Sequence, residues 1–87
     1  MRARARVARN LGRLRVQRGL SQESLAVDAG VDRTYVSRLE RGLENPTVSV
    51  LERLATACNA DVADFLMKPR PGEAPPKPLP GGRPRRQ

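Results

Sequence analysis

Apolar residues recur along the chain at the spacing of an α-helix. Val7, Leu11 and Leu14 are four and three residues apart, which places them on one face of a helix. The pattern predicts a first helix from about Arg4 to Arg18. Gly19 is expected to close it, because glycine readily adopts the left-handed conformation found just after helix ends.

Four further helices are predicted, each preceded by a residue type that caps helix N-termini. These N-caps are Ser21, Asp32, Thr47 and Asp61. The second helix is expected over Gln22 to Ala29 and the third over Arg33 to about Arg41. Gly30 and Gly42 follow them as stop signals. The middle of the chain therefore holds two short helices separated by a three-residue turn.

The last two helices bring further apolar side chains. The residues of the fourth helix expected to point inward are Val48, Leu51, Leu54 and Ala55. Asp61, with Asp64 three residues later, opens a short fifth helix that ends at Phe65 and Leu66. No strand is predicted. The expected fold class is all-α, a compact domain of five helices.

The C-terminal segment differs in composition from the rest of the chain. Residues 68–87 hold seven prolines and three glycines, too few apolar groups to bury, and no helical or strand period. We expect a disordered Pro/Gly/Arg-rich tail after a folded domain at residues 1–67. The tail is either a solvated extension, an arm that binds phosphate, or a docking peptide for a proline-binding partner.

Residue usage excludes several kinds of site. The 87 residues include no histidine and one cysteine, Cys58, so neither a disulfide framework nor a Cys/His zinc site is expected. There is no histidine base, no glycine-rich phosphate loop and no carboxylate pair beside a nucleophile, which argues against an enzyme. We expect no metal, no cofactor and no small-molecule ligand. Without an apolar run of about 18 residues, we expect no membrane span and a cytoplasmic protein.

The net charge of +8 is concentrated at the two ends of the chain. Residues 1–18 carry seven arginines and no acid, residues 19–67 carry a net charge of −4, and residues 68–87 carry +5. Basic ends around a mildly acidic middle favour a polyanionic partner, with nucleic acid the leading candidate. Two alternatives remain at this point, namely merely solvated termini and an N-terminal organelle transit peptide.

The two short helices in the middle of the chain have the spacing of a helix-turn-helix motif, at about residues 21–41. Val36 and Leu39 are apolar and three residues apart, so they should face the core. The residues on the opposite stripe of that helix are Arg33, Thr34, Ser37 and Arg38. Guanidinium groups and hydroxyls match the hydrogen-bonding edges of bases in a major groove. The alternative is an ordinary solvated helix face.

Several short motifs occur in a familiar order between about Val7 and Leu66. They are "GLSQESLA", "AGV", "SRLERG", "NPT" and "LERLA". This stretch resembles the Cro/C1-type helix-turn-helix domains of phage repressors, which have a lambda-repressor-like fold, and of small bacterial regulators. The piece "VDRTYVSRLERG" further resembles controller proteins of restriction-modification systems. The resemblance implies a bacterial or phage-like, nucleoid-associated transcription regulator that binds specific double-stranded DNA sequences.

The resemblance also implies roles for individual residues. Those at base-reading positions are Arg33, Thr34 and Arg38. Those at phosphate-contacting positions are Gln22, Ser37 and Arg41. Tyr35 either contacts bases or sugar-phosphate or packs at the domain edge. Arg15 and Glu40 align with an ion pair between the first and third helices.

Further expectations concern Glu44, Cys58 and the contact between two copies of the chain. Glu44 stands where many relatives carry a basic residue, and its carboxylate would repel phosphate. Cys58 is expected to be a small core residue. A binding helix of this size covers about half of a useful DNA site, so we expect a homodimer on an inverted repeat. The apolar run Phe65, Leu66 and Met67 is the candidate dimer contact.

Two other functions share the same features. An adaptor would keep the fold and use it to bridge proteins without contacting bases. Alternatively, the basic ends would bind RNA without sequence preference. The arginines on the third helix favour DNA recognition over both, because an adaptor has no need of guanidinium groups there.

Overall fold

The structure is a computed structural model that describes residues 2–69. Its elements are α1 (Ala3–Gln17), α2 (Gln22–Ala29), α3 (Arg33–Glu40), α4 (Val48–Ala57) and the short helix η1 (Val62–Leu66). The described residues contain no strand, so the predicted all-α class is confirmed. The fifth element is a 3₁₀ helix rather than an α-helix. Apart from its first two residues, the predicted tail lies outside the described residues.

Side-chain caps begin four of the five helices. The Ser21 hydroxyl accepts a hydrogen bond from the backbone N–H of Ser24 at 2.9 Å. The Asp32 carboxylate accepts from the N–H of Thr34 at 2.9 Å. Thr47 caps α4 in the same way, and Asp61 opens η1 with a reciprocal capping box. These bonds satisfy backbone donors that have no partner inside a helix, so each predicted N-cap is confirmed.

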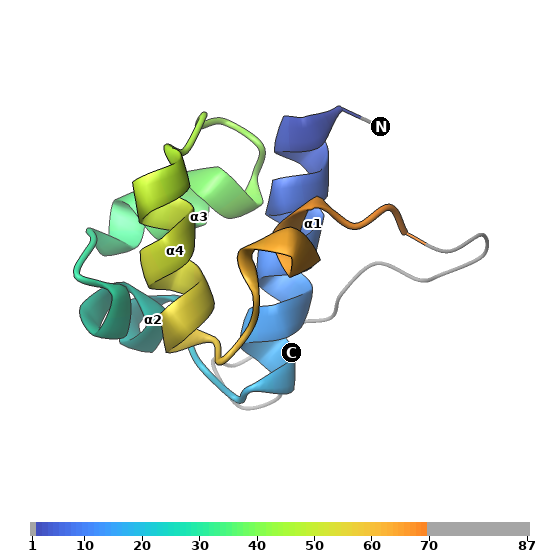
Figure 1. Ribbon diagram of the computed structural model, residues 1–87. Helices are drawn as coiled ribbons and strands as arrows, with labels where there is room; N and C mark the ends of the chain where they lie inside the picture. The colour runs from blue at the N-terminus through green and yellow to red at the C-terminus, as the bar shows by residue number, and fades with distance from the viewer. Residues whose placement is uncertain (1, 70–87) are drawn as a thin grey trace, which may run out of the picture.

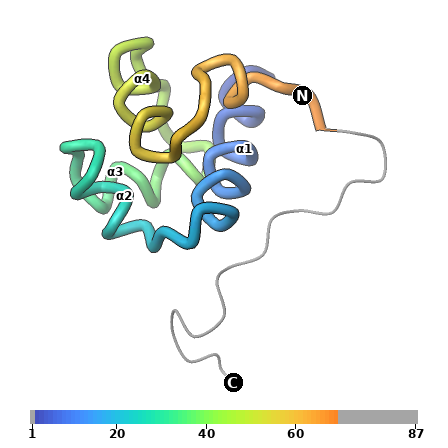
Figure 2. Tube along the Cα trace, turned by 60° about the horizontal axis from the view of Figure 1, so that its bottom comes forward, coloured from blue at the N-terminus to red at the C-terminus, as the bar shows by residue number. Residues whose placement is uncertain are grey.

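The helices enclose one small core. The helix α1 packs against α3 and η1, while α2 packs against α3 and α4. Figure 1 shows α2, α3 and α4 grouped on one side, with α1 and η1 on the other, and the turned view of Figure 2 keeps the same grouping. The buried apolar residues are Val7, Leu11, Leu25, Ala26, Ala29, Val36, Leu39, Leu51, Leu54, Ala55, Cys58 and Phe65.

The prediction is wrong for one core residue. Val48 was expected to point inward with Leu51 and Leu54, yet its side chain is 68% exposed. It is the first residue of α4, directly after the cap Thr47. Helical spacing fixes the direction of a side chain around the helix axis. It does not decide whether neighbouring elements extend far enough along that axis to cover it.

The short helix η1 is fastened to α1 by a buried amide. Asn10 is 3% exposed, and its Nδ2 donates hydrogen bonds of 2.9 Å to the carbonyl oxygens of both Phe65 and Met67. The Asn10 Oδ1 accepts from Arg13 at 3.2 Å. A buried amide needs partners for its donors and its acceptor, and here both kinds are supplied. The end of the domain is therefore held in place by side-chain bonds as well as by packing.

Among residues 2–69, no helix is both long enough and apolar enough to cross a bilayer.

Candidate nucleic-acid interface

The helix α3 turns one stripe of side chains inward and another outward. Val36 and Leu39 are 0% and 1% exposed, so they anchor the inner stripe in the core. Arg33, Thr34 and Arg38 are exposed on the outer side, as the sequence predicts. The polar face of α3 is therefore held away from the body by packing on the opposite side.

The angle between α2 and α3 is fixed by a tight turn. Gly30 has a φ of 73°, a left-handed conformation that glycine adopts without strain. The N–H of Val31 then donates to the carbonyl of Ala26 at 2.9 Å, and the Val31 side chain packs against the core. This pattern of bonds closes the C-terminus of α2 and starts α3 in a defined direction. The turn holds α2 and α3 as a rigid unit.

An ion pair ties the C-terminal end of α3 to α1. Nε and Nη2 of Arg15 donate to Oε2 and Oε1 of Glu40 at 2.6 and 3.0 Å. Both side chains are only 11% exposed. Arg15 Nη1 also donates to the carbonyl of Leu20 at 2.9 Å. Such a two-pronged, largely buried pair fixes relative orientation more than it adds net stability.

Gln22 extends this pair to α2. Its Nε2 donates to Oε1 of Glu40 at 3.1 Å, so the first residue of α2 is joined to the last residue of α3. This bond braces α3 against α2. The predicted phosphate contact of Gln22 is a separate role and stays a prediction.

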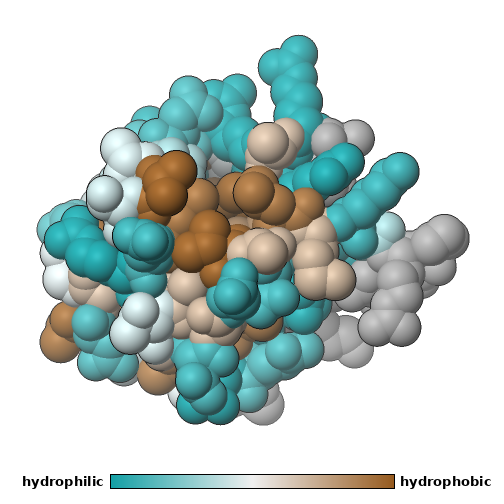
Figure 3. All heavy atoms as spheres, in the orientation of Figure 1, coloured by the Kyte–Doolittle hydropathy of each residue, from teal (hydrophilic) through white to brown (hydrophobic). Residues whose placement is uncertain are grey.

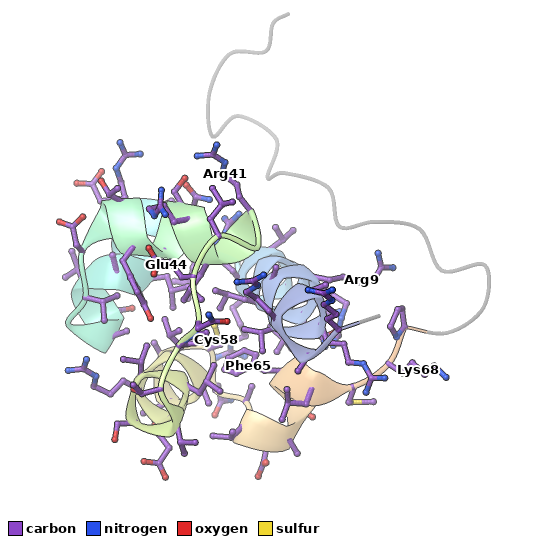
Figure 4. All side chains as sticks on the ribbon, turned by 90° about the horizontal axis from the view of Figure 1, so that it is seen from above. Arg9, Arg41, Glu44, Cys58, Phe65 and Lys68 are labelled. Atoms are coloured by element: carbon purple, nitrogen blue, oxygen red, sulfur yellow. The ribbon has the colours of Figure 1, made fainter. Side chains whose placement is uncertain are left out.

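The two remaining predicted phosphate contacts lie at the outer edge of α3. Ser37 is half-buried and Arg41 is exposed just after the helix. Figure 4 shows Arg41 pointing away from the body of the domain. The phosphate contacts expected of Ser37 and Arg41 stay predictions.

The position of Tyr35 is compatible with both roles expected for it, contact with DNA and packing at the edge of the domain. The side chain is half-buried and packs against the core. Burial raises the pKa of its hydroxyl, and the carboxylate of Glu44 raises the pKa further, while Arg53 lowers it. The hydroxyl is therefore neutral at physiological pH and can donate a hydrogen bond.

Arg38 has a partner within the protein. Its Nε donates to Oε2 of Glu44 at 2.7 Å, and its Nη2 donates to the carbonyl of Leu43 at 3.4 Å. The Arg38 and Glu44 side chains remain 45% and 30% exposed. In Figure 4, Glu44 lies beside α3, whereas Arg41 projects outward. The acidic residue thus faces an arginine of the polar stripe.

The predicted dimer contact is only partly on the surface. Phe65 is 0% exposed in the single chain, so it belongs to the protomer's own core and its prediction as a dimer contact is wrong. Leu66 and Met67 are 42% and 55% exposed. Figure 3 shows apolar residues gathered in a patch over the face where α4 and η1 lie in Figure 1.

Two functional contacts were missed by sequence reasoning. The Arg38–Glu44 pair joins residues six apart in sequence, which is not a helical spacing, so no local pattern revealed it. The role of Asn10 was detectable in principle. It lies three residues after Val7 and next to Leu11, so a helical projection places a polar residue on the apolar face of α1.

The chain is similar to known proteins in both sequence and fold. The helix-turn-helix domain family matches residues 6–65. A hypothetical transcription factor of Neisseria meningitidis is 42% identical over 67 residues, which cover 77% of this chain and 63% of that protein. The uncharacterized HTH-type transcriptional regulator y4dJ of Sinorhizobium fredii is 46% identical over 60 residues, with 69% and 78% coverage. The chain thus spans less than two thirds of the Neisseria relative.

Solved structures of similar proteins share the fold of this chain. The crystal structure of the Neisseria factor superposes with a TM-score of 0.75 at 41% identity, covering 78% of both chains. The restriction-modification controller protein C.AhdI of Aeromonas hydrophila superposes with a TM-score of 0.69 at 37% identity, covering 71% of this chain and 94% of its own. The predicted resemblance to Cro/C1-type domains and controller proteins is confirmed. With more than half of its residues matched, the chain belongs to the helix-turn-helix domain family.

Proposed function

We propose that this chain regulates transcription by binding specific sequences of double-stranded DNA through α3. The observation that carries the proposal is the outward stripe of Arg33, Thr34 and Arg38 on a helix whose other side is locked in the core. An α-helix fits the major groove, and arginine there matches guanine O6 and N7. Relatives named as transcriptional regulators support this role.

Phosphate contacts would set the position of the domain on the duplex. In this arrangement α3 enters the major groove and α2 crosses the backbone. Gln22 lies at the positive end of α2, where the helix dipole favours an anion. Ser37 and Arg41 would contact the backbone beside the groove. These contacts give affinity for any duplex, and the base contacts of α3 add the preference for one sequence.

Two copies on an inverted repeat would complete the site. One α3 helix covers half of a useful operator, so two would lie about 34 Å apart, one turn of DNA. Leu66 and Met67 are exposed apolar residues at the end of η1, and Figure 3 shows an apolar patch over the face where α4 and η1 lie. We propose this face as the dimer contact, because pairing would remove it from water.

Replacing Arg33 by alanine tests the proposal. The substitution should weaken binding to the preferred duplex by about 1–3 kcal/mol, because a bidentate arginine–guanine contact is lost. Binding to random duplex should change much less. The measurement is fluorescence anisotropy on labelled duplexes, after selection of the preferred sequence from a random library.

The matched control is Arg53→Ala, which removes an exposed cation from α4. It should leave the ratio of preferred to random affinity unchanged. An equal loss on both duplexes with Arg33→Ala would show that Arg33 contacts only phosphate. A library from which the wild-type chain selects no sequence would contradict sequence-specific binding altogether.

Replacing Leu66 by aspartate tests the dimer. Because the side chain is exposed, the domain should stay folded while the apolar contact between protomers is lost. Sedimentation should show a shift from dimer to monomer. Val27→Asp is the control, since Val27 is 74% exposed on α2, away from η1. A wild-type chain that sediments as a monomer at every concentration would contradict this contact.

A further inference from the structure

The loop after α3 holds one particular edge of the Arg38 guanidinium. A guanidinium offers two forks of parallel N–H groups, a side fork made by Nε and Nη2 and an end fork made by Nη1 and Nη2. Glu44 Oε2 accepts from Nε at 2.7 Å, and the Leu43 carbonyl accepts from Nη2 at 3.4 Å. Glu44 therefore occupies the Nε side of the guanidinium, whereas the longer bond to Leu43 is made by Nη2, the nitrogen that both forks share.

The end fork keeps Nη1 for a ligand. Within residues 2–69, nothing forms a hydrogen bond with Nη1 of Arg38. The side chain keeps 45% of its surface exposed, which leaves room for a ligand beside it. Two parallel N–H groups at the tip of an arginine match O6 and N7 of one guanine.

We propose that Glu44 is a specificity-determining residue, which positions Arg38 for end-on contact with a guanine and lowers affinity for duplexes in general. The inference rests on the proposed DNA-binding function. Glu44 acts through Arg38 and is therefore a positioning residue. Its two effects have separate causes, because the hydrogen bond orients the guanidinium whereas the negative charge repels phosphate whatever the base sequence.

The pair has reason to persist when DNA is bound. In the free protein it is exposed, and exposed ion pairs contribute little. In a groove that excludes water, an unpaired carboxylate close to phosphates would be strongly unfavourable. The complex avoids this unpaired carboxylate if Arg38 keeps Glu44 on its side fork while its end fork contacts the base. If Arg38 instead left Glu44 when DNA bound, that carboxylate would have no partner.

The experiment measures base preference and general affinity separately. Wild-type chain, Glu44→Ala, Arg38→Ala and the double variant are titrated with the selected duplex, with duplexes changed at each base pair, and with random duplex. Arg38→Ala identifies the base pair that Arg38 contacts. Glu44→Ala should reduce the preference at that same base pair by about threefold to tenfold, a part of the full value of one bidentate contact. It should also tighten binding to random duplex.

One further variant distinguishes the effect of the Glu44 hydrogen bond from the effect of its charge, and another serves as a control. Glu44→Gln keeps an oxygen that can accept from Nε, so it should retain most of the base preference while binding random duplex more tightly. Glu52→Ala removes an exposed carboxylate from α4 and is the matched control. It should leave the preference at the Arg38 base pair unchanged. Circular dichroism of each variant verifies that the domain remains folded.

Three results would overturn the inference. An unchanged preference in Glu44→Ala would show that the carboxylate contributes charge only. The same loss in the presence and absence of Arg38 would show that Glu44 contacts a base itself, for example a cytosine amino group. A wild-type chain without any preferred duplex would contradict the proposed function as well, whereas the first two results leave that function standing.

Discussion

Replacing Phe65 by alanine should lower the free energy of unfolding by about 3–5 kcal/mol. The ring is 0% exposed and lies in the single core, so its removal costs both apolar burial and a cavity. Small domains have total stabilities of about 5–15 kcal/mol, and the loss is a large share of that. Urea denaturation followed by circular dichroism, at a concentration where the wild-type chain is monomeric, measures it.

The adjacent residue provides the control. Leu66→Ala at the same concentration should change the free energy of unfolding by less than about 1 kcal/mol, because Leu66 is 42% exposed. The large difference between neighbours follows from the docking of η1 on α1. Similar small losses for both variants would show that η1 is not part of the folded core.

Replacing Glu40 by alanine should be nearly as damaging, with a loss of about 3–5 kcal/mol. Arg15 would keep its charge in a site where only 11% of its side chain is exposed, with no carboxylate beside it. Gln22 would lose the acceptor for its amide at the same time. Thermal unfolding and urea titration would both report the change.

Two comparisons identify the cause of that loss. Glu52→Ala removes an exposed carboxylate and should stay within about 0.5 kcal/mol of the wild type. The double variant Arg15→Met with Glu40→Met should be more stable than Glu40→Ala alone, because neither charge is left buried without a partner. A double variant less stable than Glu40→Ala would mean that the pair itself, rather than the unpaired arginine, dominates the effect.

The parts of the fold that depend on neighbouring residues were predictable from the sequence. Ser21, Asp32 and Thr47 each cap the helix expected of them, because a cap requires only a side chain and an N–H two or three residues later. The span Gln22–Ala29 coincides with its prediction. The inner and outer stripes of α3 also follow from helical periodicity alone.

The two wrong predictions, for Phe65 and Val48, concern residues whose burial depends on contacts with distant parts of the chain. Phe65 was assigned to a dimer contact because its apolar run exceeded what a small core would cover. Its burial depends on the docking of η1 against α1, where Asn10 binds a residue 55 positions later in the chain. No periodicity within η1 indicates that long-range bond. Val48 has an inward direction by helical spacing, but the exposure of the first turn depends on the reach of other helices.

The candidate site was predictable in its exposed residues and not in its internal bonds. The sequence places Arg33, Thr34 and Arg38 on one surface, as the structure does. It gives Glu44 a repulsive role toward phosphate and does not reveal the bond to Arg38. That bond depends on the path of the loop after Gly42, whose φ is 75°. Loop geometry of this kind is set by the whole domain.

The burial of Cys58 has a practical consequence for labelling chemistry. It is the chain's single cysteine, it is 1% exposed, and burial raises the pKa of its thiol above the ordinary value. The thiolate is the form that attacks alkylating reagents, so this buried thiol should react slowly with them in the native domain at neutral pH. A cysteine introduced at an exposed position such as Ser49 would therefore take up a dye or spin label selectively. The natural thiol can stay in place as part of the core.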